Sequence, residues 1–75
     1  MGRLRVLSGK EVCQILERNE FNEVRRRGSH VVMQKKLSDT TITVLVPNHS
    51  ELKVGTLQSI IRQSGVDRKK FEERE

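Results

Sequence analysis

A run of β-branched residues near the middle of the chain constrains the fold more than any other feature of the sequence. Five of the six residues from Thr41 to Val46 (TITVLV) are β-branched, and such residues are enriched in strands. Pro47 follows directly and ends the run, because proline cannot donate a hydrogen bond to a sheet ladder. A strand over 41–46 needs a partner, so the chain must contain a sheet.

Two earlier segments can supply the partner strands. His30 to Lys36 is rich in valine, and the turn-forming residues 37–40 separate it from the β-branched run. Phe21 to Arg26 is a weaker strand pattern, and Gly28 supplies a turn after it. Because both connections are short, we expect the three strands to form an antiparallel meander.

Helical patterns lie on both sides of the predicted sheet. Ser8 and Glu11 have the spacing of a capping box, which predicts a helix over about 9–18 with Asn19 as a left-handed stop. The apolar residues of this segment recur at helical spacing: Val12, Ile15 and Leu16.

A second helix is predicted over about 54–64, with Gly65 as its C-cap. Asp67 can cap a short last helix, and we expect the charged tail over about 68–75 to fray. The order is α-β-β-β-α, an α+β fold in which one face of the sheet carries the helices and the other is open. With 75 residues, the chain is expected to form one domain, over 1–75.

The charge of the chain favours a polyanionic partner. Its formal net charge is +5, which suits nucleic acid, an acidic protein or an anionic membrane. It has neither Trp nor Tyr, so it cannot build the aromatic platform on which many single-strand readers stack bases. We therefore expect recognition of the nucleic-acid backbone and shape. One cysteine and no long apolar segment predict a cytoplasmic protein without a membrane partner.

The sequence Gly28-Ser29-His30 is the strongest candidate for a site. It places a histidine at the start of a strand, directly after a basic turn. Histidine is the side chain whose unperturbed pKa allows proton transfer near neutral pH. RNA carries its own nucleophile, the 2′-hydroxyl, so one histidine and nearby cations can supply much of the chemistry of cleavage.

Basic residues lie on both sides of the second predicted strand, within a dozen positions of one another. Arginine is well suited to gripping phosphate, so we predict that these residues and the turn bind RNA. The predicted RNA-binding set is Arg25, Arg26, Arg27, Gly28, Ser29, Lys35 and Lys36. His49 is a secondary candidate, because a loop histidine more often has no catalytic role. Lys53 is also secondary: with the amide groups at the start of the second predicted helix, it can hold an anion.

Other kinds of site fit the sequence poorly. His30 and His49 are 19 positions apart, and no carboxylates have the spacing of metal ligands. Ser29 is adjacent to His30, but neighbouring strand residues point to opposite faces, which argues against a serine hydrolase. We therefore expect neither a metal nor another cofactor, and we read Cys13 as a packed helical residue.

Three stretches of the chain resemble the HicA-type toxins of bacterial toxin–antitoxin systems, also called the YcfA-like family. They are Ser8–Val12, Gly28–His30, and the segment from Val46 to Gly65 that contains VPNH, EL and GTLQSIIRQSG. The resemblance extends over roughly residues 7 to 71 and rests on the order and spacing of these pieces together.

The resemblance implies a double-stranded-RNA-binding-like fold, with a three-stranded antiparallel sheet and two helices on one face. It also implies a ribosome-independent mRNA endoribonuclease that arrests translation, with His30 as its catalytic residue. A HicB-type antitoxin would bind the toxin and mask His30. The toxin would then be a monomer when free and part of a hetero-oligomer with its antitoxin.

Three functions stay open at this point. The leading interpretation is a metal-independent endoribonuclease in which His30 is the general base or acid. The second is a non-catalytic RNA-binding module that uses the same basic face. The third is a protein-interaction subunit whose basic face docks onto an acidic partner.

Overall fold

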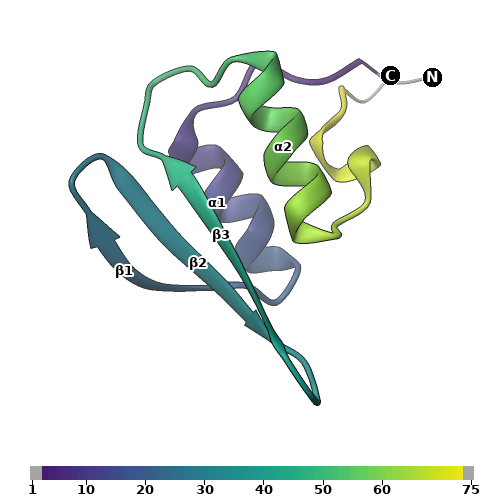
Figure 1. Ribbon diagram of the computed structural model, residues 1–75. Helices are drawn as coiled ribbons and strands as arrows, with labels where there is room; N and C mark the ends of the chain where they lie inside the picture. Colours follow the sequence, from purple (N-terminus) through teal and green to yellow (C-terminus); the bar gives the residue numbers. More distant parts are fainter. Residues whose placement is uncertain (1–2, 74–75) are drawn as a thin grey trace.

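The computed structural model describes residues 3–73, and its elements follow the predicted order (Figure 1). They are α1 (Gly9–Arg18), β1 (Asn22–Arg27), β2 (His30–Lys36), β3 (Thr41–Pro47), α2 (Val54–Ser64) and η1, a 3₁₀ helix (Arg68–Phe71). The predicted bounds of both α-helices and of the second strand are confirmed. The first strand lies one residue later than predicted, and the third also includes Pro47.

The three strands form one antiparallel sheet in the order β1-β2-β3, as predicted. The turn after β2 sets the register of the second hairpin. Lys36 pairs with Thr41 next to the turn, and the two strands then pair residue by residue as far as His30 with Pro47. The pairing of β1 with β2 shifts between Glu23 and Arg25. Val24 is therefore the extra residue of a β-bulge in the edge strand.

Both helices pack against the same face of the sheet, and the other face is open (Figure 1). Alternation along the strands turns four apolar side chains toward the helices, where they join the buried core: Val31, Met33, Val44 and Val46. The helices contribute the residues that recur at helical spacing: Val12, Ile15, Leu16, Leu57 and Ile60. This confirms the predicted α+β fold with helices on one face.

The start of α1 is fixed by the predicted capping box. The Glu11 N–H donates to the Ser8 hydroxyl at 3.1 Å, and the Glu11 carboxylate accepts from the Ser8 N–H at 2.9 Å. The hydrogen bond from the Ser8 backbone, assisted by the Ser8 hydroxyl, lowers the pKa of Glu11 below its ordinary value. The ionised form of Glu11 therefore favours this helix start.

Two local expectations are wrong. Asn19 has φ −110°, whereas the next residue, Glu20, takes the left-handed conformation with φ 74°. The reason is that Asn19 still belongs to the last turn, where its side-chain amide donates to the Ile15 carbonyl at 2.8 Å.

The charged tail does not fray from residue 68 as expected. Asp67 caps η1, and a bridge pairs Leu4 with Glu72; residues 74–75 of that tail lie outside the described part.

Candidate functional site

The Gly28-Ser29 turn places His30 at the exposed end of the sheet. Gly28 has φ 56°, a left-handed conformation that favours glycine. His30 is the first residue of β2, and its side chain is exposed to solvent. The predicted position of His30, next to a tight basic turn and accessible, is therefore what the structure shows.

The strand pairing puts His30 on the open face of the sheet. His30 lies opposite Arg27 on one side and opposite Pro47 on the other, and directly paired residues share a face. Two residues further along β2, Val32 lies opposite Arg25. The paired strand residues of this face include no acidic side chain, so His30 lies in a positive environment.

The predicted RNA-binding cations are divided between two faces and two ends of the sheet. Arg25, Arg27, Gly28 and Ser29 lie with His30. Arg26 points to the other face, where its guanidinium donates to the Glu23 carboxylate at 2.9 Å. This hydrogen bond raises the pKa of Arg26 and neutralises its charge locally.

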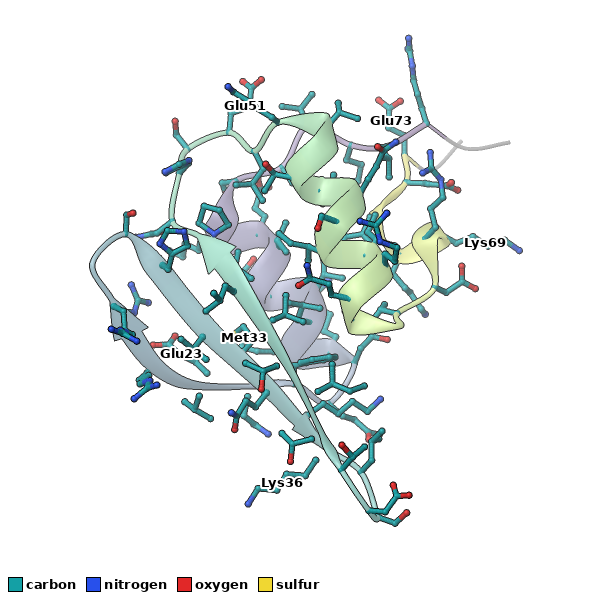
Figure 2. The ribbon with its side chains drawn as sticks, in the orientation of Figure 1. Glu23, Met33, Lys36, Glu51, Lys69 and Glu73 are labelled. Carbon is teal, nitrogen blue, oxygen red and sulfur yellow. The ribbon has the colours of Figure 1, made fainter. Side chains whose placement is uncertain are left out.

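The two lysines of β2 lie away from His30. The Lys35 ammonium sits 6.0 Å from the centre of the Phe21 ring, which keeps it at the far end of the covered face. Lys36 shares the face of His30 but is six residues further along the strand, about 20 Å away. Figure 2 shows Lys36 near the tip of the β2–β3 hairpin.

The loop after β3 returns to the Gly28-Ser29 turn. The Asn48 N–H donates to the Ser29 carbonyl at 2.6 Å, and the Gly9 N–H donates to the His49 carbonyl at 2.9 Å. We call the six residues that meet here the histidine corner: Gly28, Ser29, His30, Pro47, Asn48 and His49. The two histidines of the chain, 19 positions apart in sequence, thus lie at one corner of the fold.

Lys53 lies at the opposite end of the same loop from His49. It is the N-cap of α2, its side chain is exposed, and it makes no side-chain capping hydrogen bond. The neighbouring Leu52 is buried, and its N–H donates to the Leu7 carbonyl at 2.8 Å. An anion-binding role for Lys53 stays a prediction.

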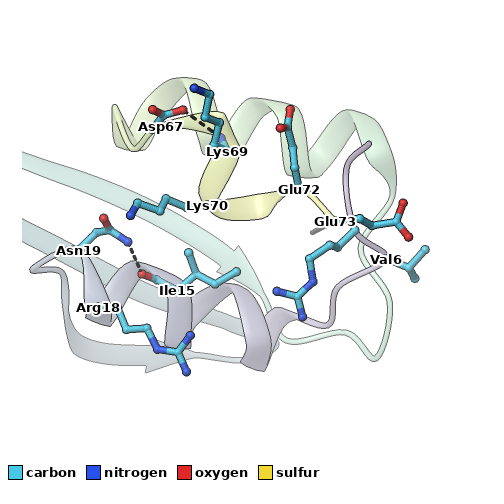
Figure 3. A pocket seen from close by; sticks show the side chains of 10 residues that line it. Val6, Ile15, Arg18, Asn19, Asp67, Lys69, Lys70, Glu72 and Glu73 are labelled. Atoms are coloured by element: carbon cyan, nitrogen blue, oxygen red, sulfur yellow. Dashed lines mark hydrogen bonds between the residues drawn. The ribbon is translucent and has the colours of Figure 1, made fainter. Parts of the chain in front are cut away.

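A separate groove of about 960 Å³ lies between α1 and η1 (Figure 3). Its lining mixes both charges, with Arg5, Arg18, Lys69 and Lys70 beside Asp67, Glu72 and Glu73. None of its lining residues belongs to the sheet or to the histidine corner. The mixed charge and the distance in the fold make this groove a weaker candidate for an RNA site.

Cys13 belongs to α1, where it was predicted to be a packed residue. Cys13 is half-buried against the core, and burial raises the pKa of its thiol, with Glu23 and Glu17 adding to the shift. No group of three or more His, Cys, Asp or Glu side chains in the described range is placed to hold a metal ion. No helix in that range is long and apolar enough to cross a membrane.

One residue that packs against the histidine corner was not predicted to matter there. A Cβ atom on Gly9 would clash with the Pro47 carbonyl oxygen. The helix start and the end of β3 can approach this closely only because residue 9 is glycine. The sequence gives no local sign of this contact, because Gly9 follows the N-cap of an ordinary helix.

Comparison with known proteins identifies the family of the chain. A search of curated proteins finds no match. A family model described as the HicA toxin of bacterial toxin–antitoxin matches residues 9–66, which is more than half of the chain. The matched range contains α1, the sheet, the histidine corner and α2. The chain therefore belongs to the HicA family, the toxins of bacterial toxin–antitoxin systems.

Proposed function

We propose that this toxin is a metal-independent mRNA endoribonuclease of a type II toxin–antitoxin system, and that His30 supplies its proton chemistry. The observation that carries the proposal is the exposed His30 beside Arg25 and Arg27, on a sheet face whose paired residues include no acid. A shallow basic surface suits a long polyanion better than a small molecule.

The reaction follows from the chemistry of RNA. The His30 imidazole accepts the proton of a 2′-hydroxyl, and the 2′-oxygen then attacks the adjacent phosphorus. The bond from phosphorus to the 5′-oxygen breaks, and that oxygen takes up a proton. Arg27, directly opposite His30, stabilises the negative charge that builds on the phosphoryl oxygens. The products are a 2′,3′-cyclic phosphate (or its hydrolysed form) and a 5′-hydroxyl.

The open face also supports a protein partner. Val24 is 49% exposed and Leu45 is 54% exposed, and Leu45 shares the face of His30 through its pairing with Val32. We propose that a HicB-type antitoxin covers this face and masks His30, so that the toxin is a monomer when free and part of a hetero-oligomer when neutralised. Apolar side chains beside a basic site suit such a cover.

The test of the function is cleavage of RNA by the free protein in excess EDTA. We expect cleavage to continue, because the mechanism uses side chains alone, and we expect 5′-hydroxyl and cyclic phosphate ends. End-labelling of the fragments measures both. If EDTA stops cleavage and Mg²⁺ restores it, the mechanism is wrong. If RNA binds but is never cut, the protein is a binding module.

Two adjacent arginines offer a matched test of the binding surface. We expect Arg27→Ala to weaken RNA binding about tenfold, since a charge-assisted contact contributes roughly 1.5 kcal/mol. Arg26→Ala should have a smaller effect, because Arg26 is paired with Glu23 on the other face. Titration at several salt concentrations measures both, and the slope should fall by about one for Arg27→Ala only. Equal effects would contradict the assignment of the open face.

A further inference from the structure

The histidine corner holds a second imidazole that the proposed reaction has not used. His49 is exposed, two residues beyond Pro47, and Pro47 is the direct partner of His30 in the sheet. Paired Cα atoms are about 5 Å apart, and two further residues extend the chain by at most about 7 Å. The two histidine Cα atoms therefore lie within about 12 Å of each other. Two imidazoles whose Cα atoms are this close are near enough to reach one phosphodiester between them.

The backbone around His49 is held in place from two directions. The Asn48 N–H donates to the Ser29 carbonyl at 2.6 Å, which ties the loop to the turn before His30. The His49 carbonyl accepts from the Gly9 N–H at 2.9 Å, which ties it to the start of α1. These are backbone contacts, so they fix where residue 49 lies without using its side chain.

Both imidazoles are free to act on a ligand. Within residues 3–73, neither ring makes a hydrogen bond or an ion pair with the protein, and both side chains are exposed. Neither imidazole is therefore committed to a contact within the described part of the protein. The position of His49 is fixed, and its functional group is left to solvent.

We propose that His49 is the general acid of the cleavage reaction, paired with His30 as the general base; this rests on the proposed function. His30 removes the proton from the 2′-hydroxyl, and the 2′-oxygen forms its bond to phosphorus. Protonated His49 gives its proton to the 5′-oxygen as the bond from phosphorus to that oxygen breaks. The two histidines end the step with exchanged protonation states, and one proton has moved from the 2′-oxygen to the 5′-oxygen.

The experiment uses two RNA substrates that differ in the leaving atom. The first is an ordinary RNA whose cleaved linkage has been mapped with the wild-type protein. The second carries sulfur in place of the 5′-oxygen at that linkage. A thiolate leaves without protonation, so a general acid does not accelerate cleavage of the second substrate. Single-turnover cleavage is measured for the wild type, His30→Ala, His49→Ala and the neighbouring control Ser50→Ala.

We expect His49→Ala to cleave the oxygen substrate about 10²-fold more slowly than the wild type and to cleave the sulfur substrate at the wild-type rate. His30→Ala should be slow on both substrates, and Ser50→Ala should resemble the wild type on both. Thermal melts check that His49→Ala is folded, which the backbone contacts of residue 49 favour.

Several results overturn the proposal. If His49→Ala cleaves the oxygen substrate at the wild-type rate, His49 is not the general acid. If His49→Ala is equally slow on both substrates, His49 contributes to cleavage in some way other than protonation of the leaving oxygen. If the sulfur substrate restores the cleavage rate of His30→Ala and not that of His49→Ala, then His30 is the general acid and the proposed roles are reversed. A wild-type protein that cleaves neither substrate contradicts the proposed function itself, which separates that failure from a failure of the His49 role alone.

Discussion

Replacement of His30 with alanine is expected to slow RNA cleavage by roughly 10³-fold while RNA binding stays close to that of the wild type. The side chain is exposed, and its loss leaves the buried core untouched. In the proposed complex the phosphate contacts come from Arg25 and Arg27, which the substitution does not alter. Cleavage and binding should therefore separate, which a purely structural histidine would not allow.

A second variant distinguishes proton transfer from hydrogen bonding at this position. His30→Gln keeps a polar side chain that can donate and accept hydrogen bonds, but an amide is neither protonated nor deprotonated near neutral pH. We expect His30→Gln to be as inactive as His30→Ala. Rates come from single-turnover cleavage and affinities from titration of the same RNA. If His30→Gln cleaves like the wild type, His30 is not the base. If His30→Ala fails to bind, His30 belongs to the binding surface.

The elements of this fold could be predicted because their signals are local. The capping box at Ser8 starts α1 whatever surrounds it, and the β-branched run marks β3 without reference to its partner strand. The register of the second hairpin could also be predicted from the sequence. Counting outward from the turn at 37–40 pairs Lys36 with Thr41 and, at the other end, His30 with Pro47. That count alone would have placed His49 near His30.

The face of each basic residue could not be predicted in the same way. The sequence of β1, NEVRRR, contains one apolar residue, so it shows no alternation of apolar and polar residues from which to assign its faces. The bulge at Val24 then shifts the register by one residue, which exchanges the two faces. The separation of Arg26 from Arg25 and Arg27 therefore depends on the pairing of β1 with β2, which is a tertiary property.

Contacts between segments that are distant in the chain also could not be predicted from the sequence. The bridge between Leu4 and Glu72 joins the two ends of the described chain, and a charged segment gives no hint of such a partner. The same holds for the Lys35 ammonium over the Phe21 ring. In each case the residue types allow many neighbours, and only the packed fold selects one.

The close approach of Gly9 to Pro47 leads to the second large effect. We expect Gly9→Ala to destabilise the protein by about 3 kcal/mol. The new Cβ would clash with the Pro47 carbonyl oxygen and would lie 3.1 Å from the Asn48 Cα. Both neighbours are backbone atoms, so they cannot move aside as a flexible side chain would. For a domain of this size the melting temperature should fall by roughly 10–25 °C.

Gly55 provides a matched control in the other helix. It is the second residue of α2 and is exposed, whereas Gly9 is buried. An added Cβ at Gly55 would meet nothing within 4 Å. Because alanine favours helix more than glycine does, Gly55→Ala should be neutral or stabilising by up to about 1 kcal/mol. Opposite signs for the two substitutions, measured by chemical and thermal unfolding, would show that the cost at Gly9 comes from the contact and not from the helix.

Gly9→Ala should also affect cleavage more than its stability loss explains. The substitution pushes on Pro47 and strains the hydrogen bond from the Gly9 N–H to the His49 carbonyl, so it moves one histidine relative to the other. Measured well below its melting temperature, the folded variant should bind RNA normally and cleave it slowly. A variant that melts early but cleaves at the wild-type rate would show that the histidine corner tolerates this displacement. The role of Gly9 would then be limited to stability.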